Sequence, residues 1–538
     1  MVTNTSTNPG SATPTVWRRS LADRTRAVAF TTVLAVMLGA CTISAGDEAG
    51  GSPAAEQGTA ALNERAHSPW PAAPPARVCG NDSILGRGPA TAPKGAVTVP
   101  AGDNRSVDFS RQGATYWFAP GAHTLGPGEY TQIEPGRNSR FVGAPGAVLD
   151  GRRVNRYAFG GRASGVTIEY LTIQNFGSIG DNNNEGVVNH DSASNWTIER
   201  NTIRRNAGAG LMIGSGNVVR LNCITRNGQY AFNAYSRRGP VGITLDRNEL
   251  SHNNTYDWEA KIGGCGCTGG GKFWSVTNAT VTSNYVHHNK GVGLWADNNN
   301  SGFLIENNYV SDNDDVGIFY ETSYNALIRR NAILRNGQVG GPDNPGFPVG
   351  GIYLSEAGAD RRVATRYRHA LRVTGNLLRD NWSGVVLWEN ADRYCGSPAN
   401  TSTGECTLVN PGVVTVRTCN ANNIGREPYY SDCRWKTQNV KVYGNTFEHS
   451  GDRVGEGCTY RRGCGLMSIM ANFGSYPEWS PYHGRVIEKA ITFNQGNTFF
   501  DNTYVGSWRF QPFDQSTLKT FAAWRAAPYR QDAGSTLR

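Results

Sequence analysis

The chain has 538 residues, 18% of them charged and 38% hydrophobic, and its formal net charge is +9. Glycine accounts for 66 of the 538 residues, well above the usual ~7%. Because glycine is a poor helix former, this composition argues against a mainly helical protein. The positive charge is too diluted over this length to indicate a nucleic-acid partner, although it permits an acidic ligand.

The N-terminal segment has the features of an export signal. Four arginines precede an uncharged apolar run, residues 27–38, which is short for a membrane span and suits a signal peptide. The run ends in Leu38-Gly39-Ala40-Cys41, which resembles the lipobox of bacterial lipoproteins. The resemblance implies cleavage of residues 1–40 and lipidation of Cys41, which would anchor the protein to the outer face of the cell membrane. An ordinary secretory signal or a short membrane anchor is the alternative.

A linker and a single folded domain follow. Residues 41–75 are rich in Gly, Ser, Ala and Pro and cannot bury enough apolar surface to offset the entropy of ordering. We therefore expect a disordered tether over residues 41–75 and one folded domain over residues 76–538.

The middle of the chain is built on a repeat. The pattern is Asn, any residue, an aliphatic residue, two further residues and a second Asn. Copies lie 21 to 26 residues apart where no insertion intervenes. Seven strict copies begin at Asn201, Asn222, Asn248, Asn284, Asn308, Asn331 and Asn376, and two looser ones begin at Asn445 and Asn497.

The repeat predicts an all-β solenoid. Segments such as residues 166–173, 303–310 and 371–378 alternate apolar and polar side chains, as short strands do. A single coil cannot bury its apolar side, but stacked coils can. The recurring Asn residues would lie at turns, where they tolerate left-handed backbone and stack into ladders. We expect a single-stranded right-handed parallel β-helix with loop insertions and a rise of about 4.8 Å per coil.

Several segments resemble a known family. They are residues 116–136, 143–151, 171–177, 293–300 and 527–537, which look like secreted bacterial right-handed parallel β-helix proteins of the pectate lyase-like superfamily. The resemblance spans roughly residues 76–538. It implies the fold but not the activity, because pectate and alginate lyases, polygalacturonase-type hydrolases, uronate epimerases and non-enzymatic surface proteins share it.

The repeat also predicts which side chains leave the coil. The fifth and seventh residues after the second Asn of each copy are apolar or small and should face inward, so the sixth and eighth should face outward. The inward columns are Leu211, Phe232, Trp258, Leu294, Ile318 and Val386 and, two residues on, Ile213, Ala234, Ala260, Ala296, Tyr320 and Trp388. The outward face would then carry Tyr235, Glu259, Lys261, Trp295, Asp297, Phe319 and Glu321, with Glu356 and Glu389 extending its acidic column.

That outward face suits a polysaccharide. Exposed Trp295 and Phe319 could stack on sugar rings, and Asp297 and Glu321 would lie on adjacent rungs roughly 5 Å apart. Two such carboxylates repel, so one pKa should rise unless a cation lies between them. The pair could bind Ca²⁺ or act as the acid and nucleophile of a glycosidase. The alternative is a solvated charged face, with Lys261 paired to a neighbour.

A loop of about twelve residues, 262–273, interrupts the coil beside this face. Lys272 closes the loop, so either Lys261 or Lys272 could supply a basic group. As surface residues, Asp297 and Glu321 should be replaceable with little loss of stability.

Three functions remain open at this stage. A polyuronate lyase is favoured, with Lys261 or Lys272 as base, Tyr235 as proton donor, and Asp297 with Glu321 holding Ca²⁺. A glycoside hydrolase would use Asp297 and Glu321 as its catalytic pair. A non-catalytic envelope protein would bind the glycan without cleaving it. In each case Trp295, Phe319, Glu259 and Glu389 are candidate substrate contacts, the partner is an acidic polysaccharide rather than nucleic acid, and we expect a monomer.

Ten cysteines remain if Cys41 is acylated, and an even number outside the cytoplasm suggests disulfides. We expect three local pairs in the long later loops, Cys395–Cys406, Cys419–Cys433 and Cys458–Cys464. The pairing of Cys79, Cys223, Cys265 and Cys267 stays open.

Overall fold

The computed structural model describes most of the chain from residue 70 onward. The expected signal peptide, Cys41 and residues 41–69 of the expected tether lie outside the described residues. The described residues are 70–178, 186–262, 266–267, 269–344, 347–367, 369–398, 406, 409–472, 474, 476–483, 485–513 and 517–538.

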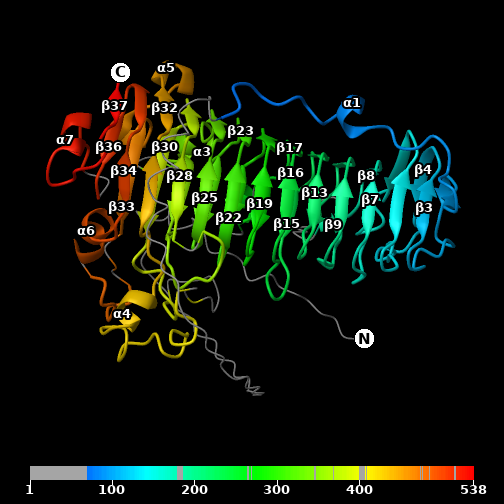
Figure 1. The fold of residues 1–538 in the computed structure, drawn as a ribbon, viewed down its shortest axis with the longest axis horizontal. Helices are drawn as coiled ribbons and strands as arrows, with labels where there is room; N and C mark the ends of the chain where they lie inside the picture. The colour runs from blue at the N-terminus through cyan, green and yellow to red at the C-terminus, as the bar shows by residue number, and fades with distance from the viewer. Residues whose placement is uncertain are drawn as a thin grey trace, which may run out of the picture.

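Three long parallel sheets run along the molecule and make it a β-helix, as the repeat predicted. From β7 to β36, successive coils contribute one strand to each sheet in turn: β10, β11 and β12 form one coil, and the next begins at β13. The coils before β7 have strands in sheets 1 and 2 alone. Figure 1 shows these coils stacked from the blue N-terminal end to the red C-terminal end.

The strands of the three sheets have the following bounds, in order along each stack. Sheet 1 comprises β1 (Val97–Val99), β3 (Thr115–Phe118), β5 (Arg140–Gly143), β7 (Thr167–Glu169), β10 (Thr197–Glu199), β13 (Val218–Arg220), β16 (Thr244–Asp246), β19 (Thr280–Thr282), β22 (Ser301–Glu306), β25 (Tyr324–Arg329), β28 (Leu371–Thr374), β31 (Val440–Tyr443) and β34 (Thr498–Phe500). Sheet 2 comprises β2 (Gly102–Asp103), β4 (Gly121–Thr124), β6 (Ala147–Asp150), β8 (Thr172–Gln174), β11 (Thr202–Arg204), β14 (Cys223–Thr225), β17 (Glu249–Ser251), β20 (Tyr285–His287), β23 (Tyr309–Ser311), β26 (Ala332–Leu334), β29 (Leu377–Arg379), β32 (Thr446–His449), β35 (Thr503–Gly506) and β37 (Thr536–Leu537). Sheet 3 comprises β9 (Gly186–Val188), β12 (Ala209–Met212), β15 (Phe232–Ala234), β18 (Gly271–Phe273), β21 (Leu294–Ala296), β24 (Ile318–Glu321), β27 (Gly350–Ser355), β30 (Ser383–Glu389), β33 (Leu466–Ala471) and β36 (Arg509–Gln511).

Short helices lie in the connections. They are α1 (Asp82–Leu85), α2 (Trp258–Lys261), α3 (Gly340–Asp343), α4 (Tyr429–Asp432), α5 (Gly451–Val454), the 3₁₀ turn η2 (Tyr460–Arg462), α6 (Arg485–Phe493) and α7 (Phe521–Arg525).

The repeated Asn residues form two buried ladders, one on each side of sheet 2. In each ladder the side-chain Nδ2 of one Asn donates to Oδ1 of the next, as from Asn284 to Asn308 at 3.0 Å and from Asn289 to Asn313 at 2.9 Å. The residue with left-handed backbone is the one before the ladder Asn, such as Asn307 with φ 56°. The side-chain amide of the ladder Asn is therefore available for hydrogen bonds between coils. The looser copy assigned to Asn497 begins at Asn502 instead, because Asn502 continues the ladder from Asn445.

The two inward columns are confirmed over most of sheet 3. Leu211 pairs with Phe232 and Leu294 pairs with Ile318, and all four side chains are buried in the core. Inside the tube the apolar side chains of successive coils pack into one continuous cluster, which is the burial that stacking provides.

The predicted columns are wrong at two coils. The rung between Phe232 and Leu294 is Gly271 of β18 rather than Trp258, because the chain leaves the coil to form α2 before it returns. A Cβ on Gly271 would lie 2.1 Å from the Phe232 ring. The Phe232 ring therefore fills the space that a side chain at residue 271 would need.

The second error is a shift of one residue in β30. Val385 pairs with Ile352 and Leu387 pairs with Leu354, so these two face the core in place of the predicted Val386 and Trp388. The connection after the ladder Asn of this coil is one residue shorter than in the other coils without an insertion, and a shift by one residue exchanges the two faces of a strand.

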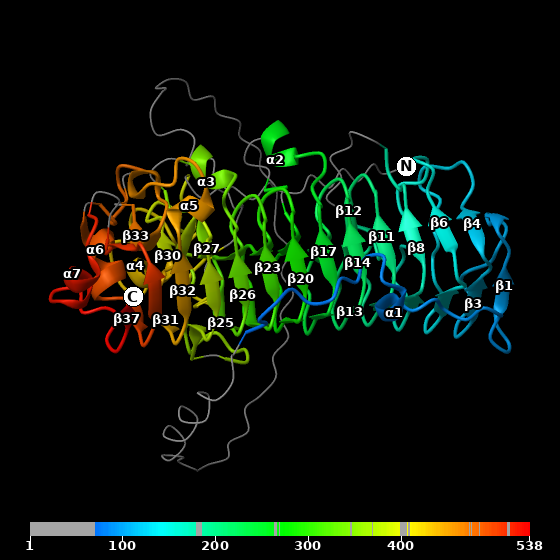
Figure 2. The same cartoon turned by 90° about the horizontal axis from the view of Figure 1, so that it is seen from above.

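The N-terminal segment of the domain is fastened across sheet 2, and Figure 2 shows it crossing the strands toward β1. Glu249 of β17 accepts hydrogen bonds from the Arg77 guanidinium and from the backbone N–H groups of Val78 and Cys79. Cys79 also forms a disulfide with Cys223 of β14. The segment is therefore held by both charge and a covalent bond.

Candidate active site

Sheet 3 carries a ladder of large side chains on its outer face. Lys272, Trp295, Phe319 and Tyr353 pair in register on β18, β21, β24 and β27. The Trp295 and Phe319 rings stack with centroids 5.4 Å apart, and those of Phe319 and Tyr353 with centroids 4.5 Å apart. The rungs of the helix thus place aromatic rings one above the other.

These rings are buried, so the prediction that Trp295 and Phe319 face solvent is wrong. Their exposed fractions are 1% and 5%. They pack in a second apolar cluster with Phe347 and Val349, from the connection before β27, and with Cys464, from a connection much later in the chain. A repeat-based analysis places a side chain on the outer face but does not show what covers it.

A cluster of five charged side chains lies beside this ladder, and we call it the ion cluster: Lys272, Asp297, Glu321, Glu356 and Arg393. Lys272 Nζ lies 2.8 Å from Asp297 Oδ2. Arg393 donates from Nη1 to Glu321 Oε1 at 2.7 Å and to Glu356 Oε2 at 3.1 Å. Trp295 donates its indole N–H to the other oxygen of Glu321 at 2.9 Å. Of the two lysines that the sequence left open, Lys272 is the one that lies against Asp297. The prediction that Asp297 and Glu321 are surface residues is wrong, because both are fully buried.

Glu321 is the unusual member of the ion cluster. Burial raises the pKa of Glu321 to about 8; Arg393 opposes the shift, while the charges of Asp297 and Glu356 add to it. Two cations face three carboxyl groups, so a protonated Glu321 leaves the cluster electrically balanced. A carboxyl group with a pKa near neutrality can both donate and accept a proton under ordinary conditions.

Lys272 is positively charged in this arrangement. Burial alone would lower the pKa of its amine, but Asp297 and Tyr230 outweigh burial and the pKa of Lys272 is raised. Its ammonium also lies 4.1 Å from the centre of the Trp295 ring. These contacts favour a fixed cation over the general base that the sequence suggested.

Tyr230 is a site residue that the sequence analysis missed. Its hydroxyl donates to the carbonyl of Gly266, and burial raises the pKa of Tyr230 to about 12, with Lys272 lowering it and Asp297 raising it. The repeat could have pointed to Tyr230. It is the third residue after the second Asn of its copy, a position at which other copies have the apolar residues Ala209, Val292 and Val316.

Arg393 and Glu356 complete the ion cluster from outside the repeat pattern. Glu356 follows β27 and Arg393 follows β30, at the start of connections whose length the repeat does not set. The acidic column suggested Glu356 only as an extension of a subsite, and no sequence pattern pointed to Arg393.

The remaining predicted residues lie apart from the ion cluster. Lys261 is exposed on α2, with its ammonium 4.7 Å from the centre of the Trp258 ring. Glu259 is also on α2, where its charge raises the pKa of Tyr230. Tyr235 is 39% exposed. Glu389 is buried on the core side of β30, where Gln495 and the backbone of Thr437 donate to it.

The donor set does not fit the calcium ion considered from the sequence. Calcium takes about six to eight oxygen ligands, whereas Asp297 faces an ammonium group and Glu321 faces a guanidinium and an indole N–H. Lys272 and Arg393 already supply the positive charge that a metal would bring, so no step is assigned to Ca²⁺.

The disulfides confirm the three local pairs. Cys395 bonds to Cys406, Cys419 to Cys433 and Cys458 to Cys464. Among the four cysteines whose pairing the sequence left open, Cys79 forms a disulfide with Cys223. Cys267 is also disulfide-bonded. None of the helices in the described part of the chain combines the length and the hydrophobicity needed to cross a membrane.

The fold defines the chain as a right-handed parallel β-helix protein. The model of the family described as "Right handed beta helix region" matches residues 185–360 and 242–401, which include Lys272, Asp297, Glu321, Glu356 and Arg393. No curated protein matches the sequence.

The solved structures that match this chain are distant in sequence. The A-module of the mannuronan C-5 epimerase AlgE4 of Azotobacter vinelandii is 12% identical with a TM-score of 0.41, over 82% of this chain and 96% of that chain. The A-module of AlgE6 from the same organism is 14% identical with a TM-score of 0.40, over 65% and 83%. A PL6 alginate lyase in complex with a trisaccharide is 12% identical with a TM-score of 0.34, over 84% and 97%.

Proposed function

We propose that this protein is an exported carbohydrate-active enzyme that acts on acidic polysaccharide by proton transfer at Glu321, most simply as a polyuronate lyase. Export is supported by the disulfides, which form and persist outside the cytoplasm. Attachment through a lipid on Cys41 is part of the same proposal.

The observation that carries the proposal is the pKa of about 8 at Glu321 beside two fixed cations. Perturbed carboxyl groups of this kind are concentrated at active sites. A structural ion network in a solenoid has no need of a surplus carboxyl group, which costs stability when it ionises.

The exposure of the ion cluster indicates the charge of the ligand. The side chains of Lys272 and Arg393 are each 8% exposed, whereas those of Asp297, Glu321 and Glu356 are fully buried. An anion that approaches the cluster therefore meets the two cations first. A uronate carboxylate in that position would have its charge neutralised, which acidifies the proton on the adjacent carbon.

β-Elimination then needs a base and an acid, and the chain offers both. Glu321 in its carboxylate form takes the proton from the carbon next to the uronate carboxylate. The bond to the glycosidic oxygen breaks, a carbon–carbon double bond forms, and the Tyr230 hydroxyl supplies the proton that the leaving oxygen needs. Because Glu321 must be ionised to act as base, the rate of a lyase should rise as the pH increases toward about 8.

A retaining glycoside hydrolase is the second candidate. Its specific support is the asymmetry of the pair, since Asp297 lies 2.8 Å from the Lys272 ammonium group while burial raises the pKa of Glu321 to about 8. Such a pair matches a nucleophile and a general acid. The hydrolase would lose activity as the pH rises through about 8, which is the opposite of the lyase.

A panel of alginate, pectate, hyaluronan and neutral glucans tests the proposal. A lyase releases products that absorb in the ultraviolet because of the new double bond, whereas a hydrolase releases reducing ends without that absorption. Binding of a glycan without either product would leave a non-catalytic envelope protein. The absence of both products and of binding on every acidic polymer would overturn the proposal.

A further inference from the structure

The corner between sheets 2 and 3 carries a row of basic side chains on four successive coils. The Asn ladder at this corner fixes the row, because hydrogen bonds of 3.0 Å join its side-chain amides at residues 206, 227, 253 and 289. The residues just before these four Asn therefore lie one above the other and span roughly 14 Å over three rungs of about 4.8 Å. We call them the cationic column: Arg205, Arg226, His252 and His288.

The backbone at this corner does not favour arginine. Arg205 and Arg226 have φ of 55° and 54°, in the left-handed region. Asn, Asp and His are the residues other than glycine that adopt this region most readily, and Asn175 does so at the same corner one coil earlier, with φ 60°. The two arginines therefore call for an explanation other than backbone preference.

Neither arginine of the cationic column has a carboxylate partner. Both side chains are exposed, and among the described residues neither forms an ion pair. Arg247, which has the same left-handed backbone at the other edge of sheet 2, instead lies 2.7 Å from Asp246. The charge of Arg205 and Arg226 is thus left for solvent or for a ligand.

Arg204 of β11 adds a third guanidinium beside the column. It donates to the neutral amide oxygen of Gln174 at 3.0 Å. Burial, and then the charges of Arg205 and Arg226, lower the pKa of Arg204. The three cations therefore repel one another, and an anion bound among them would relieve that repulsion.

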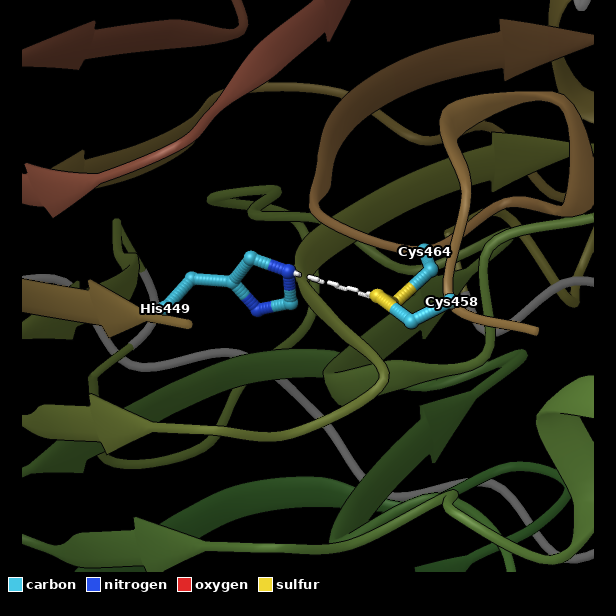
Figure 3. A group of neighbouring side chains, drawn as sticks. All are labelled: His449, Cys458 and Cys464. Atoms are coloured by element: carbon cyan, nitrogen blue, oxygen red, sulfur yellow. Dashed lines mark hydrogen bonds between the residues drawn. A yellow bond between two sulfur atoms is a disulfide. The ribbon is translucent and has the colours of Figure 1, made fainter. Parts of the chain in front are cut away.

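The basic stretch ends toward the C-terminal coils. The next residues at this corner are Asp312, Arg335, Asp380 and His449. Asp312 pairs with Arg335, and Asp380 pairs with Arg453. His449 is buried, and its Nε2 lies 3.6 Å from Sγ of Cys458, which is joined to Cys464 in a disulfide (Figure 3). The cationic column is therefore confined to the four coils from Arg205 to His288.

The two histidines of the column can add charge as the pH falls. Their rings stack with centroids 5.1 Å apart. Burial and the neighbouring cations lower the pKa of His252 to about 4, and burial lowers that of His288 although Asp312 opposes it. A bound polyanion favours the protonated rings, so its binding should strengthen in mild acid. The other titratable and charged groups around the two rings are His287, Arg77, Arg226, Arg335, Asp312 and Asp314.

We propose that the cationic column and Arg204 form an accessory site that binds one strand of an acidic polysaccharide along this corner. A row of charges one coil apart suits an extended chain that carries an anion on its sugar residues. Each contact is weak because solvent and salt screen it, so the affinity arises from several contacts to one strand.

The accessory site lies on the same coils as part of the ion cluster. The coil of His252 continues into β18 with Lys272, and the coil of His288 continues into β21 with Trp295. A polymer held at the corner therefore stays close to sheet 3. The choice of a polysaccharide among polyanions rests on the proposed function, whereas the positive charge of the column does not.

The test measures the affinity of the full-length chain carrying Glu321→Gln, which blocks the proposed cleavage, for polygalacturonate and alginate. Adding Arg205→Gln and Arg226→Gln should weaken binding by on the order of 10-fold and make it less dependent on salt concentration. The matched control adds Arg247→Gln and Arg330→Gln instead. It removes the same charge from the other edge of sheet 2, where acids face both arginines, and should leave the affinity nearly unchanged.

Three outcomes would overturn the proposal. The first is equal affinity in the Arg205→Gln/Arg226→Gln protein and its Glu321→Gln parent. The second is an equal loss in the control, which would show that only the overall charge matters. The third is weaker binding to phosphatidylglycerol vesicles with unchanged binding to both polymers, which would assign the column to a membrane surface.

A pH series tests the histidines. Binding by the Glu321→Gln parent should tighten several-fold between about pH 7 and about pH 5, and adding His252→Gln and His288→Gln should remove most of this change. An undiminished change would contradict the role of the two rings. Because these assays measure binding alone, a failure to find any cleavage product would reject the proposed function and leave the result for the cationic column standing.

Discussion

Lys272 Nζ lies 2.8 Å from Asp297 Oδ2 on neighbouring rungs of sheet 3, and both side chains are buried. The carboxylate is fully buried and the amine is 8% exposed. The pair is therefore a structural ion pair, and its lysine is also one of the two fixed cations of the ion cluster. The other cation, Arg393, lies 2.7 Å from the proposed proton-transfer group Glu321. The two roles of Lys272 can be separated by measuring stability and activity in the same variants.

Loss of the Lys272 amine should destabilise the fold strongly. Lys272→Met leaves Asp297 as a buried charge without its partner, which typically costs about 3–5 kcal/mol. Denaturant unfolding measures the change. Arg220→Met, which breaks a pair with Glu199 that is partly exposed, is the matched control and should cost about 0–1 kcal/mol. Equal losses in the two variants would show that the Lys272 pair is solvated.

Glu321 should give the protein a pH-dependent stability. Its pKa is about 8 in the fold against 4.5 for the free side chain, so between these values the folded state holds a proton that the unfolded state has lost. The contribution of Glu321 to the free energy of unfolding is therefore complete below pH 4.5 and declines as the pH rises toward about 8. The decline is at most about 1.4 kcal/mol per pH unit. In Glu321→Gln this decline should disappear, whereas Glu199→Gln should keep it. Parallel curves for wild type and Glu321→Gln would contradict the shift.

The coils and the ladder could be predicted because they depend on local periodicity. The spacing from Asn284 to Asn308 fixes one rung, and the alternation after the ladder Asn placed Leu294 and Ile318 in the core. The predicted columns are wrong at Trp258, where an insertion forms α2, and at Val386, where the connection is one residue shorter. Neither change in length alters the sequence pattern around it.

The site was predictable only in part for the same reason. Asp297, Glu321 and one of two lysines followed from rung geometry. The burial of Trp295 and the presence of Arg393 depend on contacts between segments far apart in sequence, and periodicity carries no information about such contacts.

An exposed aromatic segment beside Arg393 should contribute to substrate binding. Trp479 is 43% exposed and packs 5.8 Å from Tyr394, directly after Arg393. Exposed aromatic rings of this kind can lie against sugar faces. Trp479→Ala should raise KM several-fold with little change in kcat or melting temperature. Tyr130→Ala, at a 67% exposed ring in the N-terminal coils, should leave KM unchanged; an equal effect in both variants would argue against this subsite.

The N-terminal segment should come loose when Glu249 is removed. Burial opposes ionisation of Glu249, but His287, the Cys79 N–H and Arg77 lower its pKa to about 2. Its contribution to stability is present above about pH 4.5 and is lost as the pH falls toward 2. Glu249→Gln should increase the rate of proteolysis near Arg77 at neutral pH. It should also reduce the loss of unfolding free energy that wild type shows as the pH falls from about 4.5 toward 2. An unaltered cleavage rate would show that the Cys79–Cys223 disulfide suffices.

A single ladder amide should matter more than its exposed neighbour. Asn308 accepts from the backbone N–H and side chain of Asn284 and donates to Val281 and Asn331. Asn308→Ala leaves buried donors and acceptors unpaired, at about 1–3 kcal/mol for each group. Asn307→Gly changes the preceding residue, which is exposed and has φ 56°, and this variant should be nearly neutral. Similar unfolding midpoints for the two variants would contradict the ladder as a stabilising element.

The most direct test of the central claim is the rate of ultraviolet-absorbing product formation from acidic polysaccharides by wild type, Glu321→Gln and Glu199→Gln, each verified as folded. We predict that wild type and Glu199→Gln form product at similar rates that rise as the pH increases toward about 8, and that Glu321→Gln loses at least ~100-fold of the rate. Product formation by Glu321→Gln at the wild-type rate would contradict the assignment of proton transfer to this carboxyl group.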